Sequence, residues 1–303
     1  MFTERAFRML CFFSSRPEMR RRQLQDEAFL SGKKPAGRHF SYNKERTEKK
    51  MKTGIQISSL KPLLTTPQQV REAFEKVKAA GCQYVQLQWI DPSVSVEEIA
   101  GIVHETGLQS VSVQDFFEKV WEDPAYYIRL NQLTEGDWLC VSRIPDRFRS
   151  PEGLSQAVDL FRALAGKLEA YGQRLCFHPV YADYQTVGDI IPVDYLLEQM
   201  PDLQLCVDLY HLNRTGNNMP EWLAAHAGRV CMVHFKDETC GRLVPAGQGD
   251  TDWHGVAQAC REAGAFYAFV EQESWDRDPF ECLKEALFWI NEQVQQMTDR
   301  HPD

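Results

Sequence analysis

From Met51 onward, short apolar or β-branched segments alternate with longer amphipathic segments, and this alternation repeats eight times. Such a pattern is typical of strand–helix units on a parallel sheet. At about 32 residues per unit, the length is close to the roughly 250 residues of a (β/α)8 barrel. We therefore predict an α/β protein with a single closed (β/α)8 TIM barrel over residues 51–303, rather than an open sheet.

The expected strands are Gly54–Ser58, Gln83–Trp89, Leu108–Val113, Asp137–Arg143, Arg174–His178, Leu203–Asp208, Arg229–Lys236 and Phe266–Gln272. The expected helices are Pro67–Ala80, Val96–Thr106, Pro124–Leu133, Pro151–Tyr171, Pro192–Gln199, Pro220–Ala227, Trp253–Ala263 and Pro279–Val294. Several of these helices begin with proline and several end at glycine, which are common start and stop signals.

The charge is distributed unevenly along the chain. The whole sequence has a net charge of −9, but residues 1–50 carry 13 basic and six acidic residues and Met51 looks like a start. We expect residues 1–50 to be a disordered or non-native extension. The remaining acidic body disfavours nucleic acid as a partner because it repels phosphate backbones.

The apolar runs and the cysteines indicate the environment in which the protein works. No apolar run approaches the roughly 18 residues of a membrane-spanning helix, so we expect no membrane partner. The nine cysteines form no CxxC pair and no secretory signal is evident, which favours a cytoplasmic location.

Four expected strands carry an ionisable residue at the same end. These residues are His178, Asp208, His234 and Glu271. The residues two positions earlier are apolar and suit an interior layer: Cys176, Cys206, Met232 and Phe269. Because the active site of such a barrel forms at the carboxyl ends of its strands, these four side chains predict a divalent metal site for Mn, Co, Zn or Mg. Each residue alone could instead be a satisfied polar group at a strand end.

A second group of polar residues lies near these strand ends. Lys236 and Glu273 share the faces of His234 and Glu271, and His211 follows Asp208 by three residues. We consider Glu271, Lys236, His211 and Glu273 as catalytic candidates, although solvated charges or a capping role would also account for the last three. Arg242 could bind a substrate phosphate or hydroxyl, but a loop arginine is commonly solvated.

Amides and aromatic rings near the ends of the second and third strands are candidates for sugar binding. Gln86, Gln88 and Gln114 could hold hydroxyl groups, and Trp89 could stack on a sugar face. Phe116 and Phe117 could do the same, but aromatic residues are often simply part of the core.

The motifs themselves resemble a known family. Asp208-x-x-His211, His234-Phe235-Lys236-Asp237, Gly247-Gln248-Gly249-Asp250-Thr251-Asp252-Trp253 and Val270-Glu271-Gln272-Glu273 resemble the sugar phosphate isomerase/epimerase family, with its xylose isomerase-like barrel. The resemblance runs from about Met51 to the last helix. It implies that Asp208, His234 and Glu271 hold a metal and that His211 contacts the substrate.

The fifth strand departs from the epimerase pattern. Epimerases of this family carry a glutamate where this chain has His178, and they use two glutamates on opposite faces of the substrate. Inosose-dehydratase-like relatives instead carry a His-x-His segment, of which only His178 remains here. Asp183, five residues later, is an alternative ligand.

The resemblance implies a metal-dependent isomerase or epimerase of a keto or aldehydo sugar, sugar phosphate or polyol, acting through an enediolate. The alternatives are an inosose-dehydratase-like lyase on a keto-polyol and a non-catalytic sugar-binding barrel. Metal-assisted phosphodiester cleavage, as in abasic-site endonucleases with this barrel, is disfavoured by the acidic body. Barrels of this kind often dimerise, which leaves a homo-oligomer open.

Overall fold

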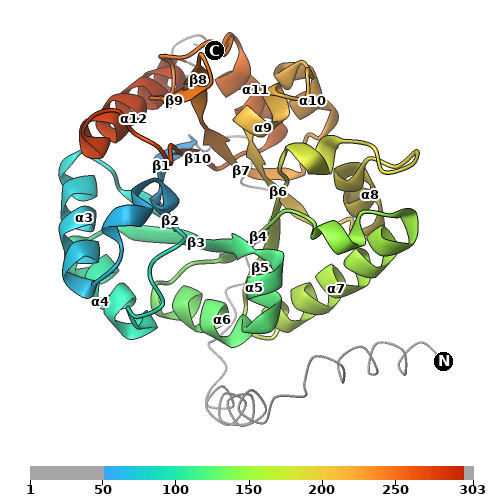
Figure 1. Cartoon of the computed structure of the whole chain (residues 1–303), viewed down its shortest axis with the longest axis horizontal. Coiled ribbons are helices and arrows are strands. Elements are labelled where there is room, and N and C mark those ends of the chain that lie inside the picture. The colour runs from blue at the N-terminus through green and yellow to red at the C-terminus, as the bar shows by residue number, and fades with distance from the viewer. Residues whose placement is uncertain (1–50, 297–303) are drawn as a thin grey trace, which may run out of the picture. The chain divides into compact units, whose positions relative to one another are not determined.

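The computed structural model describes residues 51–296; the extension expected over residues 1–50 and the last seven residues lie outside them. Eight parallel strands close into a barrel in the order β1-β10-β7-β6-β5-β4-β3-β2 (Figure 1). The strands are β1 Lys52–Gln56, β2 Tyr84–Leu87, β3 Gln109–Phe116, β4 Trp138–Ser142, β5 Arg174–His178, β6 Gln204–Asp208, β7 Val230–Phe235 and β10 Tyr267–Val270. This confirms the predicted closed barrel.

Helices surround the barrel between successive strands (Figure 1). They are α3 Pro67–Ala79, α4 Val96–Thr106, α5 Phe117–Glu122, α6 Pro124–Leu133, α7 Pro151–Glu169, α8 Pro192–Gln199, α9 Leu209–Asn213, α10 Met219–Ala225, α11 Val256–Ala263 and α12 Pro279–Gln296. Short 3-10 turns add η1 Ile57–Leu63, η2 Asp146–Phe148 and η3 Tyr181–Tyr184. No helix in this described part is both long and apolar enough to span a membrane.

Local sequence signals account for several helix starts. Thr66 and Ser150 each accept a backbone N–H at the start of a helix whose first residue is proline. Ser95 and Glu98 form a reciprocal capping box at α4, which ends at Gly107 in the left-handed conformation. The predicted pattern of proline at the start and glycine at the end is therefore present.

An apolar layer fills the barrel below its carboxyl end. It contains Val111, Trp138, Cys140, Cys176, Cys206, Cys231, Met232 and Phe269. The four residues expected to point inward are among these, which confirms the direction deduced from the two-residue period of a strand. A Cβ atom at Gly54 would lie 2.8 Å from the Phe269 ring, so glycine in β1 makes room for this layer.

A two-stranded hairpin after β7 was not expected from the sequence. Strands β8 Asp237–Thr239 and β9 Arg242–Val244 pair antiparallel. Its three-residue strands are too short to give a periodic signal. The following helix also begins at Val256 instead of Trp253, because Gly255, the residue before it, has left-handed backbone and interrupts the helix there. Trp253 belongs to the preceding loop, where its Nε1 donates to Asp237 Oδ2 at 2.9 Å.

Candidate metal centre

Four side chains meet at the carboxyl end of the barrel. His178 ends β5, Asp208 ends β6, His234 lies in β7 and Glu271 directly follows β10. One ligand atom from each lies within 4.8 Å of those of the others, and all four residues are buried. The strand register brings them level, because Asp208 of β6 lies opposite His234 of β7. Two imidazoles and two carboxylates could hold a transition-metal ion.

Two of these ligand atoms are buried without a hydrogen-bond partner. His178 Nε2 and Asp208 Oδ2 lie 3.8 Å apart, and neither makes a hydrogen bond to any described residue. The other atom of each is held in place: Ser142 Oγ lies 3.1 Å from His178 Nδ1, and Asp208 Oδ1 accepts the backbone N–H of Tyr210 at 2.8 Å. Unpaired buried polar atoms are costly, so their convergence fits a site built for a cation.

His178 is held in its neutral form. Burial, followed by the charge of nearby His234, lowers the pKa of His178 to about 3. A neutral imidazole keeps a lone pair, and the contact of Nδ1 with Ser142 directs Nε2 toward the centre. The residue therefore meets the electronic requirement for a metal ligand.

A ring of hydrogen bonds orients His234. The backbone N–H of Ser58 donates to Gln56 Oε1 at 3.4 Å, which identifies that atom of the Gln56 side chain as the oxygen. The Gln56 side-chain nitrogen, Nε2, donates to Gln86 Oε1 at 2.9 Å. Gln86 Oε1 is thereby an acceptor, and it lies 2.6 Å from His234 Nε2. Since backbone N–H groups only donate, the ring assigns the proton to Nε2. His234 Nδ1 then faces the centre, where it either shares a proton with Glu271 or offers its lone pair to a metal ion.

Glu271 closes this ring. Its Oε1 accepts from Ser58 Oγ at 3.0 Å, and its Oε2 lies 2.9 Å from His234 Nδ1. With the proton on Nε2, two acceptor atoms face each other at Nδ1 and Oε2. A cation between them, either a proton or a metal ion, is needed to make that approach favourable. The ring thus prepares a pair of ligands for one ion.

Lys236 supplies positive charge beside the two carboxylates. Its Nζ lies 2.7 Å from Glu273 Oε1, 3.5 Å from Glu271 Oε2 and 3.7 Å from Asp208 Oδ2. Burial would raise the pKa of Glu271, but Lys236 and His234 outweigh it and hold that pKa well below its usual range. The pKa of Asp208 is lowered in the same way, chiefly by Lys236 and His211 against burial. Both carboxylates are therefore ionised and able to bind a cation.

Glu273 differs from its neighbours. Burial, and then the charge of Glu271, raise its pKa above the usual value. One of its oxygens accepts from Lys236, and the other, Oε2, is buried without a partner among the described residues. A carboxyl group with a raised pKa and a free oxygen has the properties of a general acid or base.

His211 lies at the edge of the same centre. Its Nε2 is 3.8 Å from Asp208 Oδ2, and its Nδ1 is buried without a hydrogen bond to any described residue. The α9 helix positions it one turn after Asp208, whose carboxylate caps this helix. The structure therefore brings His211, Lys236 and Glu273 to the four candidate ligands.

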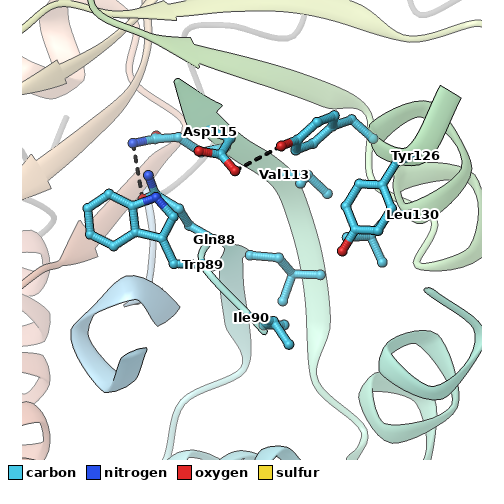
Figure 2. Close-up of a pocket in the computed structure, with 10 residues that line it drawn as sticks. Gln88, Trp89, Ile90, Val113, Asp115, Tyr126 and Leu130 are labelled. Carbon is cyan, nitrogen blue, oxygen red and sulfur yellow. Dashed lines mark hydrogen bonds between the residues drawn. The ribbon is translucent and has the colours of Figure 1, made fainter. Parts of the chain in front are cut away.

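The amides and Trp89 lie on the opposite half of the barrel, at the ends of β2 and β3. Gln114 Nε2 donates to Gln88 Oε1 at 3.3 Å, and both residues help to line a pocket of about 30 Å³ with Trp89 (Figure 2). This volume holds little more than a water molecule. Gln86, by contrast, is fully buried in the ring around His234.

Two other sequence candidates lie apart from the four ligands. The Asp183 carboxylate binds Arg149 at 2.8 Å and accepts the backbone N–H groups of Val180 and Ile144. It is therefore occupied in η3, and His178 is the strand-five residue in the cluster. Arg242 is exposed on β9 of the hairpin.

The sequence did not identify several residues that support the site. Ser58, Ser142 and Gln56 orient ligands, but nothing in their local sequence distinguishes them from ordinary core polar residues. Asp237 is buried and accepts from Gly247 N, Gly249 N and Trp253 Nε1, so it organises the glycine-rich loop that follows the hairpin. Its place in the His-Phe-Lys-Asp motif, followed by closely spaced glycines, was the available signal.

Known proteins share this architecture. One solved structure, an L-ribulose 3-epimerase, has 14% identity and a TM-score of 0.67, covering 84% of this chain and 98% of its own. A sugar phosphate isomerase/epimerase from Parabacteroides distasonis has 15% identity, TM-score 0.66, and coverages of 80% and 94%. A 3-keto-D-glucoside 4-epimerase from E. coli has 20% identity, TM-score 0.62, and coverages of 80% and 100%.

At such identities these likenesses show the fold. No curated protein sequence matches the chain. A family model described as a xylose isomerase-like TIM barrel matches residues 132–293, which is more than half of the chain and includes all four candidate ligands. This chain belongs to the xylose isomerase-like TIM barrel family.

Proposed function

We propose that this protein is a divalent-metal-dependent isomerase or epimerase of keto or aldehydo sugars, or of their phosphates, acting through an enediolate. The observation that carries the proposal is the convergence of His178, Asp208, His234 and Glu271, with two ligand atoms that make no hydrogen bond to any described residue. A divalent ion held there would polarise the substrate carbonyl and acidify the adjacent C–H bond.

The chain's own groups would move the proton. Glu271 is ionised and borders the centre, so it is the first candidate for the base that removes the proton beside the carbonyl. Glu273 has a raised pKa and a free oxygen, and Lys236 donates to it, so this pair is suited to returning a proton. His211 is the candidate on the β6 side of the centre.

A lyase is the second candidate, and one observation favours it. His178 stands at the end of β5, so among residues 51–296 the carboxylates of the centre come from β6 and from the segment after β10. Proton removal and proton donation from the Glu271–Lys236–Glu273 side would suit loss of a β-hydroxyl from the same enediolate. Reprotonation of the opposite face would instead require His211 or His178.

The test is hydrogen exchange in deuterated water. Candidate keto sugars and keto-polyols are incubated with the metal-loaded protein, and deuterium incorporation is followed together with product mass. We expect incorporation at the carbon next to the carbonyl, lost in Glu271→Gln. An unchanged mass apart from deuterium indicates isomerisation or epimerisation, and loss of water indicates the lyase. If sugars bind but no deuterium enters any of them, the protein is a binding barrel.

A further inference from the structure

Two strand ends on either side of β3 hold strained residues that converge on one ring. Trp89, after β2, has φ of 56°, and Arg143, after β4, has φ of 50°. Left-handed backbone is uncommon for residues other than glycine and tends to occur at functional sites. The strand between them ends in Phe116, and both side chains contact its ring.

These contacts form a surface that we call the cationic wall, made of Lys61, Trp89, Phe116 and Arg143. The Trp89 and Phe116 ring centroids lie 5.7 Å apart. The Arg143 guanidinium carbon is 5.2 Å from the Phe116 centroid, and Lys61 Nζ is 4.8 Å from the Trp89 centroid. The two cations are therefore positioned by aromatic faces.

Neither cation of the wall has a carboxylate partner within residues 51–296. Arg143 Nε is buried and makes no hydrogen bond there. The nearby Arg147 and Arg149, in contrast, pair with Glu118 and Asp183. The wall therefore carries two positive charges that have no carboxylate partner among these residues.

The one acid of β3 at this end does not neutralise the wall. Asp115 accepts from the Tyr127 hydroxyl at 2.8 Å and from the backbone N–H of Phe116 at 2.8 Å. Figure 2 shows its carboxylate directed away from Trp89 and toward the helical layer. Its charge is therefore bound on the outer side of the sheet.

The wall borders the candidate metal centre. The Arg143 backbone N–H donates to the His178 carbonyl at 3.0 Å, and Ser142, the preceding residue, contacts the His178 ring. The wall occupies the β1–β4 side of the barrel mouth, with Lys61 in η1 after β1, and the carboxylates occupy the β6–β10 side. The mouth is thus cationic on one side and anionic on the other.

We propose that the cationic wall binds an anionic oxygen group, a phosphate or a carboxylate, on the small molecule that enters the mouth. A planar guanidinium matches two oxygens of such a group, and the Arg143 guanidinium has no carboxylate partner within residues 51–296 that would compete for it. Trp89 and Phe116 offer a face to the carbon skeleton. That this molecule is the substrate rests on the proposed function, and it names the substrate class as a sugar acid or sugar phosphate.

The test follows the Arg143 Nε–H resonance by NMR in the metal-free full chain. Arg143→Lys identifies the resonance by its disappearance. Inorganic phosphate, acetate and neutral glycerol are titrated separately, with sodium chloride holding the ionic strength constant. We expect a saturable shift with phosphate or acetate and none with glycerol, and the stronger of the two anions identifies the preferred group. Lys61→Met should raise the anion concentration at half-saturation about threefold, as the loss of one exposed charge does.

Arg147→Gln is the matched control, because it removes an exposed arginine of the following turn and should leave the midpoint unchanged. No shift with either anion, or equal shifts with glycerol, overturns the inference. So does an equal effect from Arg147→Gln, which would indicate general ion binding. Because the titration needs neither metal nor turnover, its outcome is independent of the deuterium-exchange test of the proposed function.

Discussion

At the scale of single residues, the chemistry depends on which atom of each ligand is left free. The ring through Gln56, Gln86 and Ser58 begins at a backbone N–H and determines the proton position on His234. Ser142 similarly engages Nδ1 of His178. Supporting hydrogen bonds of this kind orient imidazole ligands and make them more basic. The candidate ligands are therefore only part of the site.

Gln86→Leu should weaken metal binding by about 10- to 100-fold, as loss of such a supporting contact typically does. The leucine is similar in size but removes the acceptor for His234 Nε2. Isothermal titration with Mn²⁺ or Co²⁺ measures the effect. Gln88→Leu, which alters a buried glutamine outside the ring, is the control. Equal affinities for the wild type and Gln86→Leu would show that the ring does not orient a ligand.

His178 predicts a specific pH dependence of stability in the metal-free protein. Its pKa is about 3 in the folded state, against an ordinary histidine value of 6.5, so folding releases its proton. The contribution of His178 to the free energy of unfolding is fully present above pH 6.5. It is lost as the pH falls toward 3, by up to about 1.4 kcal/mol per pH unit.

His178→Gln should therefore flatten the decline between pH 6.5 and 4.5, above the range where Glu271 and Asp208 take up protons. Urea unfolding at several pH values measures the free energy of unfolding. His254→Gln, at an exposed position, is the control and should follow the wild type. Parallel wild-type and His178→Gln curves would mean that folding does not lower the pKa of His178.

At the scale of elements, the loop between β9 and α11 depends on one carboxylate. Asp237 binds three backbone N–H groups and one indole of this loop, at Gly247, Gly249, Thr251 and Trp253. A Cβ atom at Gly249 would lie 2.2 Å from Asp237 Oδ1, so the second glycine allows this close approach. The hairpin and loop are thus one folded unit beside Lys236.

Asp237→Asn should destabilise the protein by about 2–4 kcal/mol, because the new NH₂ group would face N–H donors in a buried position. Chemical denaturation measures this change, and hydrogen exchange should show faster exchange at Gly247 and Gly249. Asp250→Asn, at an exposed acid of the same loop, should have little effect. A stability change below about 0.5 kcal/mol for Asp237→Asn would contradict this role for the carboxylate.

The direction of most side chains at the strand ends was predictable, because side chains along a strand point alternately to its two faces. An apolar residue two positions before His178, Asp208, His234 and Glu271 indicated that all four point inward. The hydrogen bond between Gln86 and His234 was not predictable, because barrel closure brings together residues 148 positions apart. The left-handed backbone at Trp89 and Arg143 was equally hidden, since no glycine marks it.

At the scale of the whole molecule, the described barrel is closed without the first 50 residues. β1 begins at Lys52 and pairs with β2 and β10, and Met51 is buried in the core. We therefore predict that deletion of residues 1–50 leaves the thermal midpoint and the metal affinity unchanged. Calorimetry and metal titration of the shortened chain measure both. A loss of cooperative unfolding would show that the barrel needs the preceding segment.

The most direct test of the account is metal analysis of the purified full chain after supply of manganese, cobalt or zinc. We predict about one divalent ion per chain, lost in Asp208→Asn and Glu271→Gln. Glu262→Gln, at an exposed acid of α11, should retain it. A wild-type chain that binds no divalent ion under any of these conditions, or variants that bind as much as the wild type, would contradict the assignment of this site.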